Sequence, residues 1–193
     1  HGIAQAAISA RLYLKRNVKT YKALFESVHY REALVKQTTS LRNQIHKSLD
    51  RLFPGFIAKT SPLSEITAPA LKLFEHCHFS AADFRKRSMK QVARMMKDAK
   101  VKNPEVAAKS YKELAKNAFC PLSGEDLLLW KNRIKLQVGN LREVQKCVDF
   151  EEHTMATLLA KTPGVGLTSI VGISIINAAT IMAELGPPEF WGS

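Results

Sequence analysis

Between Ser123 and Lys161, apolar residues recur at every seventh position for five repeats. The spacing predicts one long helix with a coiled-coil seam, because a seven-residue repeat keeps one stripe of a helix facing its partner. Gln137 and Glu151 interrupt this seam, and both are candidates for fixing the register or the choice of partner. The first positions of the repeat are Leu127, Ile134, Leu141, Val148 and Met155, and the fourth positions are Trp130, Gln137, Val144, Glu151 and Leu158.

The two ends of this helix carry start and stop signals. Ser123 is a favourable N-cap, and Asp126 three residues later suits a capping box. Thr162 precedes Pro163 and Gly164, which end a helix. At about 1.5 Å per residue the helix is roughly 55 Å long, so another long element must lie along it.

A second long helix is predicted from Tyr21 to Phe53, and Pro54 with Gly55 ends it. The segment before it is rich in alanine and also has helical spacing. The helix over 21–53 is long enough to pack against the 123–161 helix, either within one chain or across a dimer, and the pattern does not choose between these. Its apolar side consists of Leu34, Thr38, Leu41, Ile45, Leu49 and Leu52.

A small helical insert, at about 69–119, separates the two long helices. Ser80 and Asp83 predict the start of a helix that runs to about Lys102, and Pro104 suits the first turn of the next. The chain is therefore expected to be all-α, with two long coiled-coil helices and this insert, followed by a helix-hairpin-helix-like segment.

The last segment, from residue 162, carries no charge until Glu184. Its prolines, glycines and polar residues argue against a membrane helix. Two glycine turns compete for the hairpin, one at 163–166 and one at 170–174. A glycine turn of this kind exposes backbone N–H groups at a helix start, where they can hold a phosphate, and Gly172 is the candidate residue.

The formal net charge of +12 is unevenly placed. Residues 1–53 have ten cations against three acids, residues 54–120 have thirteen against six, and residues 121–193 have six against eight. The basic surface is therefore N-terminal and central, which points to a polyanion, with nucleic acid ahead of an anionic membrane.

The predicted helix over 80–102 carries the candidate nucleic-acid contacts Lys86, Lys90, Arg94 and Lys97. Their spacing of three or four places them on one helix face, suited to a phosphate backbone. A solvated helix face is the alternative. No metal site is expected at His76-Cys77-His78, since no second ligand pair stands at a zinc spacing. The three cysteines, Cys77, Cys120 and Cys147, are expected to be free thiols in a reducing compartment.

Two segments carry a family resemblance. LTSIVGISIINAATIMAELGPPEF, residues 167–190, resembles the start of the C-terminal transposase domain of the DEDD-type insertion-sequence transposases, which include the Piv-like invertases and the bridge-RNA-guided recombinases. There the family has an Ile-Pro-Gly-Ile-Gly turn, an Ala-Ala helix and Ala-Glu-hydrophobic-Gly; Val171 and Ser174 depart from the turn. VHYREALVKQTTSLRNQIHKSLDRLFPGF, residues 28–56, resembles the family's Arg-Glu-x-Leu-Val helix.

The resemblance implies DNA transposition by strand exchange. In the family, a RuvC-like domain holds Mg²⁺ with four acidic residues and a C-terminal domain supplies a nucleophilic serine. Neither centre is assigned here, because no Asp or Glu precedes Glu26 and no serine stands in the motif; no catalytic residue and no cofactor is predicted for this segment. By resemblance, 1–20 is a remnant of the RuvC-like domain, 21–161 a coiled-coil stalk and 162–193 the truncated start of the transposase domain.

By this resemblance, the expected function is that of the nucleic-acid-binding and dimerisation portion of a DNA recombinase, in a bacterial or archaeal cytoplasm. DNA is the expected partner, a structured guide RNA is left open, and a homo-oligomer through the coiled coil is expected. The alternatives are a stand-alone helical module that binds nucleic acid without cutting it, and a structural coiled-coil protein.

Overall fold

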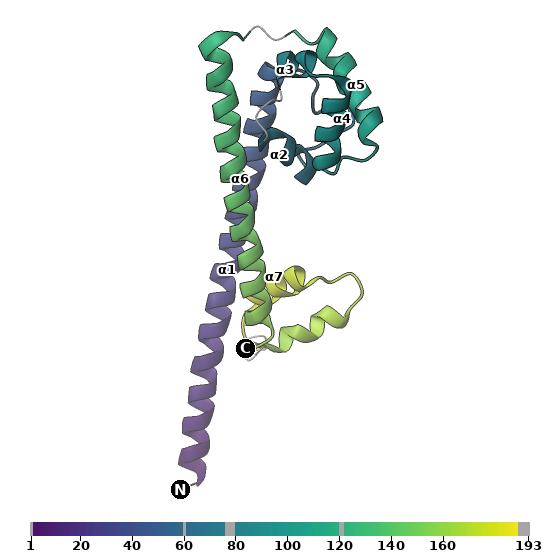
Figure 1. The fold of residues 1–193 in the computed structure, drawn as a ribbon. Coiled ribbons are helices and arrows are strands. Elements are labelled where there is room, and N and C mark those ends of the chain that lie inside the picture. Colours follow the sequence, from purple (N-terminus) through teal and green to yellow (C-terminus); the bar gives the residue numbers. More distant parts are fainter. Residues whose placement is uncertain (1, 60, 76–79, 120–121, 189–193) are drawn as a thin grey trace. The chain divides into compact units, whose positions relative to one another are not determined.

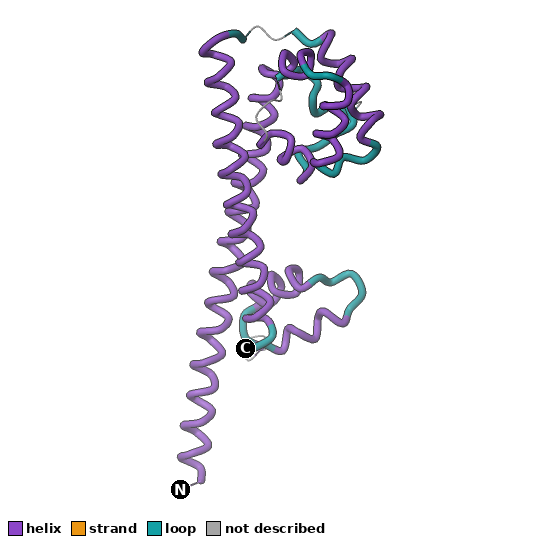
Figure 2. The backbone as a smooth tube through the Cα atoms, in the orientation of Figure 1, coloured by secondary structure: helices purple, strands orange, loops and turns teal. Residues whose placement is uncertain are grey.

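The computed structural model describes residues 2–59, 61–75, 80–119 and 122–188 (Figure 1). Within these ranges all regular structure is helical and no strand occurs, so the all-α prediction is confirmed (Figure 2). The elements are α1 (Gly2–Leu52), α2 (Ala68–Glu75), α3 (Ala81–Lys86), α4 (Met89–Asp98), α5 (Pro104–Asn117), α6 (Gly124–Leu159), the 3₁₀ helix η1 (Pro163–Ser169) and α7 (Ile175–Leu185).

The chain divides into two compact units. Unit 1 comprises His1–Gln37 and Val144–Ser193, and unit 2 comprises Thr38–Glu143. The long helices α1 and α6 therefore contribute residues to both units, whereas α2 to α5 belong to unit 2 and α7 belongs to unit 1.

Helix α1 is continuous from Gly2 to Leu52. The prediction of a separate helix beginning at Tyr21 is wrong, because no proline or glycine stands between residues 3 and 53 to interrupt the helix. The predicted end is confirmed: the helix stops before Pro54, and Gly55 has a φ of +78°, a conformation that favours glycine.

In unit 2, α1 lies against α6 in antiparallel orientation. Ser48 donates a hydrogen bond to Gln137 at 3.0 Å, and the guanidinium of Arg51 lies 4.5 Å from the ring centre of Trp130. Residue numbers therefore rise along α1 as they fall along α6. The buried apolar side chains of this part of the two helices are Leu41, Ile45, Leu49, Leu52, Ile134, Val138 and Leu141.

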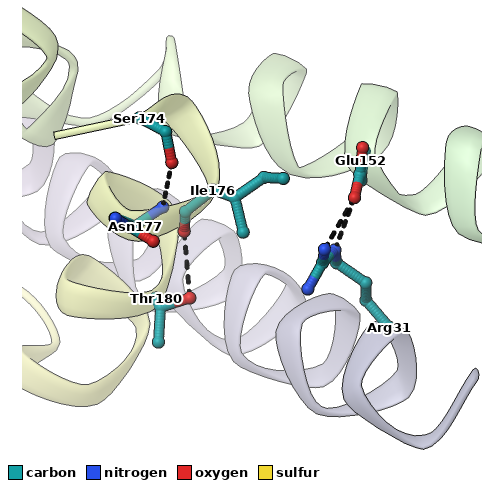
Figure 3. A network of polar contacts seen from close by, with 6 residues as sticks. All are labelled: Arg31, Glu152, Ser174, Ile176, Asn177 and Thr180. Carbon is teal, nitrogen blue, oxygen red and sulfur yellow. Dashed lines mark hydrogen bonds and ion pairs between the residues drawn. The ribbon is translucent and has the colours of Figure 1, made fainter. Parts of the chain in front are cut away.

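In unit 1, α1 and α6 pack together with α7 around one apolar cluster. Arg31 of α1 pairs with Glu152 of α6 at 2.7 Å, as Figure 3 shows, and Ser27 donates a hydrogen bond to Glu151 at 2.5 Å. The cluster is formed by Tyr21, Leu24, Val28, Met155, Leu159, Ala178, Ala179, Met182 and Ala183. The two long helices thus pair with each other within one chain in each unit. The sequence alone allowed either this pairing or one across a dimer.

The predicted seam of α6 is confirmed at three of its five first positions, where Ile134, Leu141 and Met155 are fully buried; Leu127 and Val148 are only partly buried. At two of the fourth positions the buried side chain is that of the next residue. Val138 is buried in place of Gln137, and Leu159 in place of Leu158; Gln137 and Leu158 are only partly buried. An α-helix turns once in 3.6 residues and drifts against a strict 3.5-residue repeat, which accounts for the shift.

The core of unit 2 is aromatic. Phe53, Phe56, Phe84 and Tyr111 are completely buried, and the rings of Phe56 and Tyr111 stack at 4.6 Å between centroids. The hydroxyl of Tyr111 donates a hydrogen bond to the carbonyl of Phe56 at 3.0 Å and accepts one from the N–H of Leu63 at 3.2 Å. Burial raises the pKa of Tyr111 to about 12, against the opposing hydrogen bonds of Ser61 and Leu63. The loop after α1 is thereby tied to α5.

Candidate nucleic-acid interface

Helix α4 presents three cations on an exposed face. Lys90, Arg94 and Lys97 are all exposed, and their spacing of four and three residues aligns them along the helix. On the opposite face, Val92 and Met96 are fully buried in the core of unit 2. The packing of the apolar face therefore fixes which way the basic face points.

The start of α4 is set by a capping box. The hydroxyl of Ser88 accepts a hydrogen bond from the N–H of Gln91 at 3.3 Å, and the side chain of Gln91 accepts one from the N–H of Ser88 at 2.9 Å. Two of the N–H groups that a helix start leaves unpaired are satisfied in this way. The helix that carries the cations consequently begins at Met89.

Lys112 of α5 fixes the break before α4. Its ammonium group donates hydrogen bonds to three carbonyls at the end of α3, those of Phe84 at 2.9 Å, Arg85 at 3.0 Å and Arg87 at 2.6 Å. A cation at a helix C-terminus satisfies carbonyls that have no partner in the helix and interacts favourably with the helix dipole.

The prediction of one helix over 80–102 is therefore wrong. The prediction that Lys86 shares one helix face with Lys90, Arg94 and Lys97 is wrong for the same reason. Lys86 is the last residue of α3, whereas the other three belong to α4. The start of α3 is confirmed, because Ser80 and Asp83 form the predicted capping box. Ser88 and Gln91 have the same spacing as Ser80 and Asp83, so a sequence signal for the second helix start exists.

Asp83, the acid of α3, is already paired. Asp83 lies 2.5 Å from the ammonium group of Lys131 in α6 and accepts a hydrogen bond from the hydroxyl of Ser80 at 2.6 Å. Burial raises the pKa of Asp83, but the hydrogen bonds from Lys131 and Ser80 and the charge of Lys131 outweigh it, so that the pKa lies below its usual value. The pair holds α3 against α6 and offsets the negative charge of Asp83.

Helix α5 also carries cations, but acids are interleaved with them. Lys109 lies four residues after Glu105 and four before Glu113, a spacing that places the opposite charges side by side on the helix. In α4 the only acid is Asp98, at the end of the helix. The basic face of α4 is therefore the stronger candidate for binding an anion.

Gly172, the remaining predicted contact, belongs to unit 1. Its φ of +93° explains the need for glycine, and nothing within 4 Å would oppose a Cβ atom there. The turn at 170–174 joins η1 to α7, and Ser174 caps α7 by accepting a hydrogen bond from the N–H of Asn177 at 3.1 Å (Figure 3). Val171 beside it is fully exposed, and no cation occurs from 162 to 183. Its role in binding stays a prediction.

The other glycine turn, at 163–166, forms η1 instead, and Gly164 has a packing role in it. A Cβ atom on Gly164 would lie 2.1 Å from Cγ of Met182. Only glycine therefore allows η1 to lie this close to α7.

A second basic site lies on unit 2, in a hollow of about 330 Å³ between α1 and α6. The guanidinium of Arg133 lies 4.8 Å from the ring centre of Trp130, which is also in contact with Arg51. Lys47 contributes a third cation. No local spacing in the sequence predicts this site, because its residues come from two helices.

No group of three or more His, Cys, Asp or Glu residues that could hold a metal ion occurs in the described ranges. His76, Cys77, His78 and Cys120 lie outside them, and Cys147 is an exposed free thiol. None of the described helices combines the length and the apolar composition that a bilayer crossing requires.

Comparison with known proteins gives no match to a family profile, to a curated protein or to a solved structure. Membership of the DEDD-type transposases therefore stays a prediction that rests on the two segments quoted above.

Proposed function

We propose that this chain is the nucleic-acid-binding portion of a DNA transposase, and that the basic face of α4 contacts the phosphate backbone. The observation that carries the proposal is the alignment of Lys90, Arg94 and Lys97 on an exposed face whose opposite side is anchored in the core of unit 2. Cations held on a rigid helix can follow a row of phosphates, since they need not be ordered on binding.

This mode of binding positions nucleic acid without reading its sequence. Lysine and arginine on phosphates release condensed counterions, which makes the affinity depend steeply on salt, whereas specificity needs contacts to base edges. Duplex DNA is the expected ligand, with a structured RNA as the alternative.

The recombinase part of the proposal is supported by the resemblance of residues 28–56 and 167–190 to the transposase family. The neighbouring sequence in the source DNA tests it. The family requires a RuvC-like domain with four acidic metal ligands before this segment and a nucleophilic serine after it. Their absence from the adjoining reading frame would favour a stand-alone binding module.

Self-association through the long helices belongs to the same proposal. In support, α6 exposes Leu128, Leu129 and Leu136, each more than half accessible, on surfaces that α1 does not cover. Sedimentation equilibrium over a range of protein concentrations tests the proposal: a chain that stays monomeric at the highest concentration would contradict it.

The decisive experiment for α4 is the triple variant with Lys90, Arg94 and Lys97 each changed to Gln. Because each lost phosphate contact lowers the slope of log affinity against log salt by about 0.9 on duplex DNA, the slope should flatten by about 2 to 3. Gln has a helix propensity close to that of Lys and Arg, so the fold should be retained, and circular dichroism checks it.

A matched control removes the same charge elsewhere in unit 2, by changing Lys59, Lys109 and Lys116 to Gln. All three are exposed. An equal effect of the two triple variants would show that binding depends on net charge alone. An unchanged slope in the α4 variant would show that the basic face of α4 is solvated and does not contact nucleic acid. Absence of any binding would favour a structural coiled-coil protein.

A further inference from the structure

The hollow between α1 and α6 in unit 2 gathers positive charge around one aromatic ring. Arg51 and Arg133 approach Trp130 at 4.5 and 4.8 Å from the ring centre, so their charges can be no farther apart than the sum of these distances. Lys47 stands one helical turn before Arg51 and lines the same hollow. An anion in the hollow would interact favourably with all three cations.

The other polar groups of the hollow also favour an anion. Gln137 uses its side-chain oxygen to accept the hydrogen bond of Ser48 at 3.0 Å, so the group it has left for a ligand is the NH₂ donor. None of the described residues that line the hollow is acidic: they are Gln44, Lys47, Ser48, Arg51, Trp130, Arg133 and Gln137. A guanidinium group matches the geometry of phosphate oxygens with two parallel N–H bonds.

The shape of the site distinguishes it from the face of α4. Its volume of about 330 Å³ is at the lower end of the range of ligand pockets, which is room for a single nucleotide rather than for a double helix. An aromatic ring and guanidinium planes are the surfaces on which splayed bases stack, while cations hold the adjoining phosphate.

We propose that the hollow lined by Lys47, Arg51, Trp130 and Arg133 binds a phosphate of an unpaired nucleic-acid strand, with the adjoining base against the Trp130–arginine surface. The inference rests on the proposed nucleic-acid binding but assigns it a second site, separate from α4 and specific for a single strand. Duplex DNA is held along α4, and an unpaired strand enters the hollow.

The fluorescence of Trp130 provides a direct test. The chain has two tryptophans, Trp130 and Trp191, so the full chain carrying Trp191→Phe reports from the hollow alone. Titration with an oligothymidylate of about twelve nucleotides, long enough to fill a single-strand site, should give a saturable change in Trp130 emission. Pyrophosphate and a blunt duplex of equal length are titrated in parallel.

The matching variants are Lys47→Gln with Arg133→Gln and, as a control on the same two helices, Arg42→Gln with Lys135→Gln. Arg42 and Lys135 are exposed and do not line the hollow. The first pair should lower the affinity for the labelled oligonucleotide at least about tenfold and flatten its salt slope by about 1.4, since each phosphate contact to a single strand contributes about 0.7. The control pair should change the affinity by less than about threefold, as expected for surface charges that touch no ligand.

Three results would overturn the inference. The first is binding of the oligonucleotide without a change in Trp130 emission. The second is a change in Trp130 emission with pyrophosphate equal to that with the oligonucleotide at the same concentration. The third is an equal change with the duplex. Each leaves the proposed role of α4 standing. That role fails on a different measurement, the salt slope of duplex binding in the α4 variant, so the two failures are distinguishable.

Discussion

Ser48 on α1 donates a hydrogen bond of 3.0 Å to the side-chain oxygen of Gln137 on α6, at a place where the apolar seam of α6 is interrupted. Ser48 is almost fully buried. The second interruption, Glu151, likewise accepts a hydrogen bond from a serine of α1, Ser27. Each polar residue of the seam therefore has a serine partner, which favours the observed pairing over one shifted by a turn.

A double-mutant cycle tests this pairing. Ser48→Ala and Gln137→Leu should each lower the free energy of unfolding by about 1 kcal/mol, because each leaves a polar partner unsatisfied. The double variant, which replaces both by apolar groups, should recover most of that loss. Urea denaturation measures all four proteins. Strictly additive losses would show that the two side chains act independently.

The ammonium group of Lys112 should stabilise the junction between α3 and α4. Lys112→Met keeps most of the apolar stem but leaves three carbonyls without their donor, so the free energy of unfolding should fall by about 2 kcal/mol. Lys116→Met, at an exposed position of the same helix, serves as the control and should stay within about 0.5 kcal/mol of the parent protein. Equal stability of the two variants would contradict the capping role.

Tyr111→Phe should destabilise unit 2 by about 1 to 3 kcal/mol at neutral pH, because the carbonyl of Phe56 and the N–H of Leu63 lose their partner in a buried site. The difference should change at alkaline pH. Burial raises the pKa of Tyr111 from 10.0 to about 12, so its phenol ionises more readily in the unfolded chain. The stability that the protonated phenol contributes is thus present below pH 10 and is lost as the pH rises toward 12.

Between those pH values the gap between parent and variant should shrink by about 2 to 3 kcal/mol, the equivalent of a pKa shift of about two units. Chemical denaturation at closely spaced pH values measures it. Tyr30→Phe is the control, since Tyr30 is more than half exposed. A gap that stays constant from pH 10 to pH 12 would show that Tyr111 ionises alike in the folded and unfolded chain.

Gly164→Ala should loosen the docking of α7 in unit 1. The added methyl group would meet Cγ of Met182 at 2.1 Å, so the buried Met182 side chain must change its rotamer or η1 and α7 must separate, at a cost of about 2 kcal/mol. Gly166→Ala is the control within the same 3₁₀ helix, because a Cβ atom there meets nothing within 4 Å. Hydrogen exchange of the α7 amides measures the effect, and equal protection in both variants would contradict the close packing.

The sequence by itself determined the helical class and most helix boundaries. The predicted helix over 123–161 is α6, Gly124–Leu159, and the predicted helix start at Ser80 and Asp83 is the start of α3. These boundaries are local, since proline, glycine and capping residues act within one turn of the chain. The apolar side of α1 was predictable for the same reason, because Leu41, Ile45 and Leu49 repeat with the helical period and are buried.

Only the tertiary structure decided what the polar and charged residues do. The separation of Lys86 from Lys90 depends on Lys112, 26 residues after Lys86, as well as on the local cap at Ser88. The serine partners of Gln137 and Glu151, and the meeting of Arg51 and Arg133 on Trp130, each join α1 to α6. Periodicity indicates which face of a helix is apolar, but it carries no information about which residue of a distant helix will lie opposite. That pairing is set by the packing of the folded chain, and the candidate sites follow from it.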